Sequence, residues 1–193
     1  MPDLTDDAVL NALLVKAQAS DTKAFDALTT LLRPQLERFL WRILAHQLTV
    51  DDVVQNTMIA MYMNLQKFTS VAHMRAFGFR VARNKSYDFL RRERRRPTVS
   101  LHTQVVPAKN TSPEDNAHWL LLYEKVQGAI DKLPAPQREV LLLHHEGKLT
   151  YNEIAQMLGI PEGTVKTRIF NARKKLVRAL PPDIIRAIIA DDG

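Results

Sequence analysis

The sequence predicts an all-α protein of two small helical domains joined by a flexible linker, the second domain containing a helix-turn-helix. Apolar residues recur every three to four positions in both parts of the chain, and the strict alternation typical of strands is absent. A polar stretch with three prolines separates the two periodic parts. We therefore expect one domain at 1–96, a linker at 97–117, and a second domain with a short C-terminal tail at 118–193.

The first domain is predicted to be helical throughout. Asp21 precedes an amphipathic stretch and is a suitable N-cap for a second helix. Pro34 is expected to break or kink the chain after Leu32, because proline removes a backbone donor and clashes with the preceding turn. A further helix is expected to start near Thr49, and another to span about 73–95.

The segment PTVSLHTQVVPAKNTSPEDN lacks any helical period. Its length exceeds that of the usual connections within a compact domain, which indicates an interdomain linker. Helical periodicity resumes from Ala117.

The composition favours a soluble intracellular protein, which we expect in the cytoplasm. Cysteine is absent, which excludes disulfides and thiolate metal sites, and the start MPDLTDDAV does not resemble a signal peptide. No apolar run approaches the length needed to span a bilayer. The formal net charge is +6 and the pI about 9.7, which favours a polyanionic partner. Two clusters carry most of this charge: Arg80, Arg83, Lys85, Arg91, Arg92, Arg94, Arg95 and Arg96, and then Lys166, Arg168, Arg173, Lys174, Lys175 and Arg178.

The stretch YNEIAQMLGIPEGTVKTRI has the pattern of a helix-turn-helix. Gly159 lies where the first helix is expected to end, because glycine adopts the left-handed conformation of a tight turn without strain. Pro161 is expected in the first turn of the next helix, whose Val165 and Ile169 face inward. Gly163 in that first turn would allow close approach of a phosphate or groove wall.

The second helix of this motif is the predicted DNA-reading element. Burial of its apolar face leaves residue types that bond to base edges and phosphates on its outer faces. The candidate DNA-binding residues are Gly163, Thr164, Lys166, Thr167, Arg168, Asn171 and Arg173.

Residues 133–176 resemble the C-terminal promoter-binding domain of bacterial sigma factors, although LuxR-type regulators share the Arg-Glu-Val-Leu and Gly-Thr-Val-Lys patterns. The stretches DDVVQNTMIAMYMNLQKF (51–68) and FGFRVARNKSYDFLRRERRR (77–96) resemble the other conserved sigma domain. Their size and order are similar to those of an extracytoplasmic-function (ECF) sigma factor. The resemblance leaves out only the linker and the tail PPDIIRAIIADDG.

The resemblance implies a role for each stretch of the first domain. It implies that the first stretch contacts the β′ coiled coil of core RNA polymerase, through Asp51, Asp52, Val54, Gln55 and Asn56. It implies that the second melts and reads the −10 promoter element, through Arg80, Arg83, Asn84, Tyr87, Arg91 and Arg94. It implies that the helix-turn-helix recognises the −35 element.

The implied partners are core RNA polymerase, through its β′ coiled coil and its β flap, and promoter DNA. The resemblance leaves an anti-sigma factor open as a further partner, and no membrane contact is expected. No cofactor, metal or catalytic residue is expected either.

The sequence departs from the family pattern at several positions. Thr49 and Asn56 stand where an acidic residue is common, which implies weaker docking on core polymerase. The loop that captures a flipped base in the family is expected at 68–74, here FTSVAHM, and lacks the expected polar residues. Gly78 lies inside a predicted helix, where glycine costs about 1 kcal/mol relative to alanine.

Two other classes of function predict features that can be compared with this sequence. A stand-alone regulator of LuxR type predicts an upstream sensor domain with strands, which the first domain does not show. An enzyme or metal protein could use His144-His145-Glu146 as a metal site, but adjacent helical residues point to different sides and no third ligand follows at metal spacing. A helix surface is the favoured interpretation there.

Overall fold

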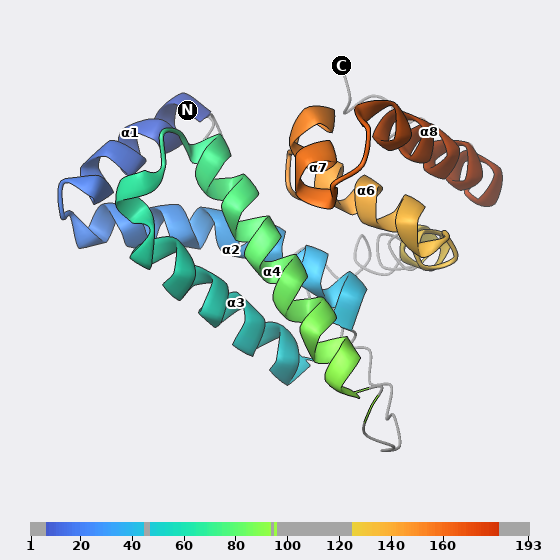
Figure 1. Ribbon diagram of the computed structural model, residues 1–193, viewed down its shortest axis with the longest axis horizontal. Coiled ribbons are helices and arrows are strands. Elements are labelled where there is room, and N and C mark those ends of the chain that lie inside the picture. The colour runs from blue at the N-terminus through green and yellow to red at the C-terminus, as the bar shows by residue number, and fades with distance from the viewer. Residues whose placement is uncertain (1–6, 45–46, 94, 96–124, 182–193) are drawn as a thin grey trace, which may run out of the picture. The chain divides into compact units, whose positions relative to one another are not determined.

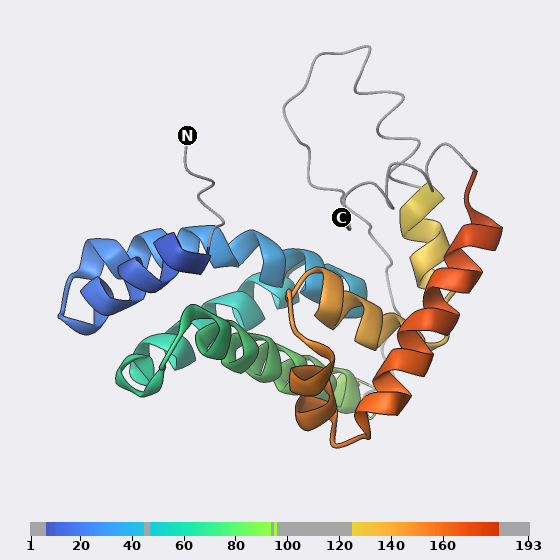
Figure 2. The same ribbon diagram turned by 90° about the horizontal axis from the view of Figure 1, so that it is seen from above.

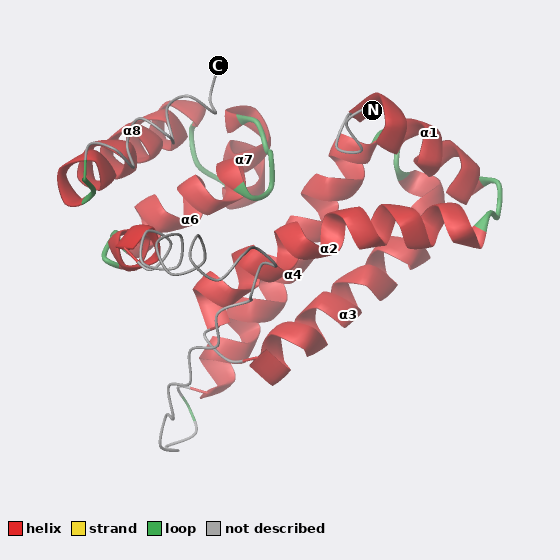
Figure 3. Ribbon diagram, turned by 180° about the vertical axis from the view of Figure 1, so that it is seen from behind, coloured by secondary structure: helices red, strands yellow, loops and turns green. Residues whose placement is uncertain are grey.

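The computed structural model describes residues 7–44, 47–93, 95 and 125–181, and every regular element within these ranges is helical (Figure 3). The all-α prediction is confirmed. The predicted linker, the first residues of the predicted second domain and the end of the C-terminal tail lie outside the described residues. The described helices form two compact units, one with α1 to α4 and the other with α6 up to His144, α7 and α8 (Figure 1).

The first unit is a bundle of four α-helices. They are α1 (Asp7–Gln18), α2 (Thr22–Leu44), α3 (Gln47–Met63) and α4 (Val71–Glu93), with a short 3-10 helix η1 (Leu65–Lys67) between the last two. Helix α2 packs against each of the other three α-helices, and α3 packs against α4. The largest fully buried side chains of this unit include Leu28, Leu36, Phe39, Leu40, Met61, Met74 and Phe79.

The start of α2 follows the sequence prediction. The backbone N–H of Ala24 donates a hydrogen bond of 3.1 Å to Oδ1 of Asp21. This bond satisfies one of the donors that every helix N-terminus leaves unpaired. The predicted N-cap is therefore confirmed.

Of the two outcomes expected at Pro34, the break is wrong, because α2 runs uninterrupted from Thr22 to Leu44. The kink stays a prediction. Proline inside a helix costs about 3 kcal/mol. Pro34 lies on the exposed side of α2, while Leu28, Leu32 and Leu36 on either side of it are buried. Each fully buried leucine contributes about 1.5–3 kcal/mol, so packing of both halves of α2 on one core outweighs the local cost.

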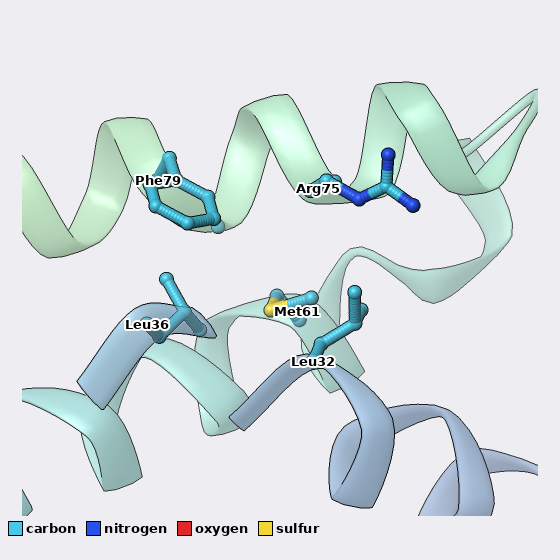
Figure 4. Close-up of a pocket in the computed structure, with 6 residues that line it drawn as sticks. Leu32, Leu36, Met61, Arg75 and Phe79 are labelled. Carbon is cyan, nitrogen blue, oxygen red and sulfur yellow. The ribbon is translucent and has the colours of Figure 1, made fainter. Parts of the chain in front are cut away.

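Gly78 allows α3 and α4 to cross closely. A Cβ atom added to Gly78 would lie 2.9 Å from Sδ of Met61, and Met61 is itself buried. Figure 4 shows Met61 of α3 between Leu32 and Leu36 of α2 on one side and Arg75 and Phe79 of α4 on the other. The glycine that appears unfavourable in a helix thus has a tertiary explanation.

Gly78→Val is expected to destabilise the first unit by about 1–3 kcal/mol, because the added side chain overpacks the core against Met61. Urea unfolding followed by Trp41 fluorescence in a Trp119→Phe background measures this loss. Gly128→Val is the matched control, since an added Cβ there meets nothing within 4 Å. Equal urea midpoints for the two variants would contradict the close-crossing explanation.

Helix α1 fixes the connection between α3 and α4. Nε2 of Gln18 donates to the carbonyl oxygens of Leu65 (3.0 Å) and Phe68 (2.8 Å). The N–H of Val71 donates to Oδ1 of Asn11 at 2.7 Å. Because α4 already begins at Val71, the predicted loop at 68–74 is too long, and only 68–70 lie outside a helix.

The second unit contains α6 (Ala135–His145), α7 (Tyr151–Leu158) and α8 (Glu162–Ala179), preceded by a helical segment at 125–131. Its core joins α6 to α8: Leu133 and Leu141 form a buried cluster with Ala172, against which Leu176 packs. Figure 2 displays α8 along its length. The predicted helical periodicity is therefore present from 125 onward.

Candidate nucleic-acid interface

The turn between α7 and α8 has the geometry predicted for a helix-turn-helix. Thr150 and Glu153 form a capping box at the start of α7: the N–H of Glu153 donates to Oγ1 of Thr150 (3.3 Å), and the N–H of Thr150 donates to Oε2 of Glu153 (2.8 Å). Gly159 ends α7 in the left-handed conformation, with φ of 65° and ψ of 36°. The conformation expected of Gly159 is confirmed.

Pro161 lies one position before the predicted one. It is the N-cap of α8 with extended backbone (ψ of 144°), and the helix itself begins at Glu162. The Pro161 carbonyl accepts hydrogen bonds from the N–H groups of Thr164 (2.9 Å) and Val165 (3.3 Å). Proline therefore directs the chain into α8 without occupying its first turn.

Helix α8 presents two chemically different faces. Val165, Ile169 and Ala172 are buried, as the sequence predicts for the first two. The candidate DNA-binding residues lie away from this stripe: Gly163, Lys166, Thr167 and Arg173 are exposed, and Thr164, Arg168 and Asn171 are half-buried. All seven candidates thus lie on one helix, outside its buried stripe.

Gly163 is open to solvent in this structure. A Cβ atom added there would meet no atom within 4 Å, so packing within the protein does not require glycine at this position. Its φ is not among the positive values, so the backbone does not require glycine either. The small residue leaves the backbone of the first turn of α8 accessible to a ligand.

Lys166 is held by an acidic neighbour that the sequence analysis did not single out. Its Nζ lies 2.8 Å from Oε1 of Glu162, one turn earlier. This hydrogen bond lowers the pKa of the Glu162 carboxyl and raises the pKa of the Lys166 ammonium, so both groups are charged at neutral pH. The i, i+4 spacing of Glu and Lys is the sequence signal for such a pair.

Phe170 is a second residue of α8 that the sequence analysis passed over. Its side chain is 66% exposed, although phenylalanine is usually buried. The signal was available, because Phe170 falls outside the stripe formed by Val165, Ile169 and Ala172.

Helix α4 carries the second basic surface. Arg80, Asn84, Tyr87 and Arg91 are spaced by four, three and four residues, which places them on one helix face. Arg80, Asn84 and Arg91 are exposed, and Tyr87 is half-buried. The opposite face is buried, with Val71, Met74, Arg75, Gly78, Phe79, Ala82 and Ser86.

Two candidate arginines of α4, Arg80 and Arg83, make cation–π contacts with aromatic rings. The guanidinium carbon of Arg83 lies 4.9 Å from the ring centroid of Tyr87, and that of Arg80 lies 5.6 Å from the ring centroid of Phe77. Such cation–π contacts hold the guanidinium groups along the helix. Phe79 is a core residue, as expected, and the candidate Arg94 lies outside the described residues.

Four of the five polymerase-docking candidates form an exposed surface on α3. Asp51, Asp52, Gln55 and Asn56 are exposed, and Nδ2 of Asn56 donates to the carbonyl oxygen of Asp52 at 2.8 Å. Val54 is 0% exposed and belongs to the core. The prediction that Val54 is a contact residue is therefore wrong, because its side chain faces the opposite side of the helix from the four polar side chains.

No metal centre is evident in the described part of the chain. No group of three or more His, Asp and Glu residues is placed there to hold an ion. The ring of His144 instead lies 5.0 Å from that of Tyr151.

None of the described helices combines the length and hydrophobicity that a bilayer-spanning helix requires.

Comparisons with known proteins match both units. The family profile described as Sigma-70 region 2 matches residues 28–96, and that described as Sigma-70, region 4 matches residues 123–176. The ECF RNA polymerase sigma factor EcfG of Rhodopseudomonas palustris (strain TIE-1) is 31% identical over 170 residues, covering 83% of this chain and 92% of the relative.

Two solved structures share the fold. CnrH, in complex with the cytosolic domain of CnrY, matches with a TM-score of 0.59 and 26% identity, covering 95% of this chain and 98% of CnrH. The sigma factor RpoE of Bartonella quintana, in complex with the anti-sigma factor NepR, matches with a TM-score of 0.63 and 23% identity, covering 81% of this chain and 96% of RpoE. The region 2 match to the first unit separates this chain from a LuxR-type regulator. The chain belongs to the ECF sigma factors, which join core RNA polymerase and direct transcription initiation at specific promoters.

Proposed function

We propose that α8 enters the major groove of the −35 element, that α4 reads and opens the −10 element, and that α3 docks on the β′ coiled coil of core polymerase. The observation that carries this proposal is that each helix buries an apolar stripe in its unit and leaves its polar candidate residues outside that stripe. We further propose the division into a region 2 domain at 1–96, a linker at 97–117 and a region 4 domain at 118–193.

The proposed role of α8 rests on its charge and its accessibility. Lys166, Thr167 and Arg173 are exposed on a helix that starts with an open glycine backbone at Gly163. Cations along a helix compensate phosphate charge, and Arg and Lys also recognise guanine edges in the major groove. A helix of 18 residues projecting its basic face is suited to this groove.

The proposed role of α4 rests on the stripe formed by Arg80, Asn84, Tyr87 and Arg91. Separated DNA strands expose phosphates and unstacked bases, which favour cations interleaved with aromatic rings. The contact between Arg83 and the Tyr87 ring provides this combination on one surface. A promoter strand following this face would meet both kinds of group in turn.

The remaining partners follow from membership of the family. We propose a second contact of the polymerase, through its β flap, with the region 4 domain. CnrH and the Bartonella RpoE are each described in a complex with another protein, an anti-sigma factor in the case of RpoE, and we propose that an anti-sigma factor regulates this chain too. We propose that the protein acts in the cytoplasm as an initiation factor without enzymatic activity of its own.

Arg168→Ala and Lys166→Ala are each expected to weaken promoter binding about tenfold, because a good contact to a base edge is worth about 1–3 kcal/mol. Fluorescence anisotropy of a labelled promoter, titrated with holoenzyme, measures the loss. The promoter is one on which the wild-type holoenzyme initiates. Lys132→Ala removes a charge from an exposed turn outside α8 and serves as the control. Wild-type promoter occupancy in both α8 variants would refute the placement of α8.

Glu162→Gln is expected to strengthen promoter binding by about two- to fivefold at low salt. The change removes a negative charge from the first turn of α8 and frees Lys166, whose exposed ion pair with Glu162 is weak and screened by salt. The same anisotropy titration at two salt concentrations tests this. Weaker binding of the variant would indicate that Glu162 itself accepts a hydrogen bond from DNA.

A further inference from the structure

Phe170 is an exposed aromatic residue in the middle of a basic helix. All seven phenylalanines lie within the described residues, and Phe170 is the only one of them that is exposed. Its side chain is 66% accessible, so the second unit does not use the ring in its own core. A ring of this size gains considerable free energy when it is removed from water, which indicates a partner surface.

The neighbours of Phe170 indicate what that partner is. Lys166 and Thr167 lie one turn before it and Arg173 and Lys174 one turn after it, and all four are exposed. The ring is thus flanked along α8 by cations on both sides, which is complementary to a polyanion. Val177, two turns on, is 50% exposed and extends the apolar surface, but Arg173 and Lys174 lie between the two apolar side chains.

We propose that Phe170 contacts the 5-methyl group of a thymine in the −35 element and so contributes directly to the choice of promoter. Within the major groove, this methyl is the apolar group that base edges present, and phenylalanine is among the side chains that contact it. The proposal rests on the proposed entry of α8 into that groove. It adds a base-reading residue to the polar set identified from the sequence.

Replacing thymine by deoxyuridine removes only the methyl group and therefore tests the contact directly. Each thymine of the −35 element, on both strands, is replaced in turn, and holoenzyme binding is measured by anisotropy. Wild-type protein is expected to lose about fourfold in affinity at one position, the gain that burial of one methyl group supplies. Phe170→Ala is expected to bind the thymine and uracil duplexes equally, and Phe170→Leu to retain part of the discrimination.

The variants should fold, because position 170 is exposed and alanine and leucine are better helix formers than phenylalanine. Circular dichroism of the full chain checks this. Equal methyl sensitivity of wild type and Phe170→Ala, no sensitive position, or a −35 element without thymine would each overturn the proposal. Loss of binding to core polymerase in Phe170→Ala, with no methyl sensitivity in wild type, would assign the ring to a protein partner instead.

The Lys166→Ala and Arg168→Ala titrations separate the two levels of failure. Weakened promoter binding in those variants, together with a silent methyl substitution, would reject the role of Phe170 alone. Normal promoter binding in Lys166→Ala, Arg168→Ala and Phe170→Ala would reject the placement of α8 in the groove.

Discussion

Replacing Arg80 and Arg91 by glutamate is expected to abolish promoter opening while leaving binding to core polymerase intact. Both side chains lie on the exposed stripe of α4, and their contacts within the described residues are on the surface: Arg91 lies 3.6 Å from the exposed Asp88, and Arg80 lies over the half-buried Phe77 ring. Each arginine that contacts a phosphate contributes to binding through counterion release, and a glutamate in its place repels the strand. We expect the open-complex population to fall by about two orders of magnitude.

Permanganate reactivity of unpaired thymines in the −10 region measures this opening. Lys16→Glu plus Lys23→Glu is the matched control, since both lysines are exposed on other helices and the change in net charge is the same. Wild-type reactivity in the arginine variant would contradict the assignment of α4. Equal losses in both variants would indicate a general charge effect with no contribution from the stripe.

Reversing the charge of Asp52 is expected to weaken binding to core polymerase at least tenfold. Asp52 lies at the centre of the exposed surface of α3, beside Gln55 and Asn56, while Val54 anchors the helix from beneath. If α3 docks on core polymerase as proposed, a lysine there replaces the acidic group at the interface with a like charge to basic groups of the partner, and like charges across an interface are costly. Competition with a labelled reference sigma factor for core polymerase measures the affinity of Asp52→Lys.

The opposite change should have the opposite result. Thr49→Asp plus Asn56→Glu adds two negative charges to α3 and is expected to tighten binding, if the reduced acidity of this helix weakens docking. For the Asp52→Lys variant, the matched control is Asp131→Lys, which reverses a charge at an exposed position in the second unit. Unchanged affinity of the double variant would reject the idea of weakened docking, and normal binding of Asp52→Lys would reject the docking surface.

The sequence predicted those features that depend on local chemistry. Gly159 adopts the left-handed conformation expected of it, Asp21 caps α2, and Val165 and Ile169 are buried. Each of these follows from backbone preferences or from a 3.6-residue period within one element. The two helical halves were visible for the same reason, whereas the family was indicated by the resemblance of the stretches 51–68, 77–96 and 133–176 to sigma factor domains.

The errors come from tertiary packing, which no local pattern records. Pro34 leaves α2 continuous because residues on both sides of it are buried in one core. Gly78 lies inside a helix as expected, but the reason for a glycine there, the position of Met61 seventeen residues earlier, is likewise tertiary. Val54 differs from these two: the family resemblance implied it as a docking residue, and the helical period alone would have turned it inward, where it is buried.

The candidate DNA-binding residues of α8 were chosen from the sequence for their charge or polarity, so the exposed aromatic residue of this helix was left out. Listing cations and polar side chains finds Lys166 and Arg173 but passes over Phe170, because an isolated phenylalanine is assumed to be buried. The inward stripe predicted from Val165 and Ile169 already leaves Phe170 outside it, and its 66% exposure agrees with that position. Aromatic residues outside such a stripe are therefore the ones to examine on a basic helix.

Transcription with purified core polymerase on genomic promoter fragments, including one from upstream of this protein's own gene, tests the central claim most directly. The account predicts discrete run-off transcripts that require both this protein and core polymerase, and that disappear when either the −10 or the −35 element is scrambled. It also predicts weak binding of the protein alone to the same fragments. Transcripts unchanged by its omission, or tight promoter binding without core polymerase, would contradict the account.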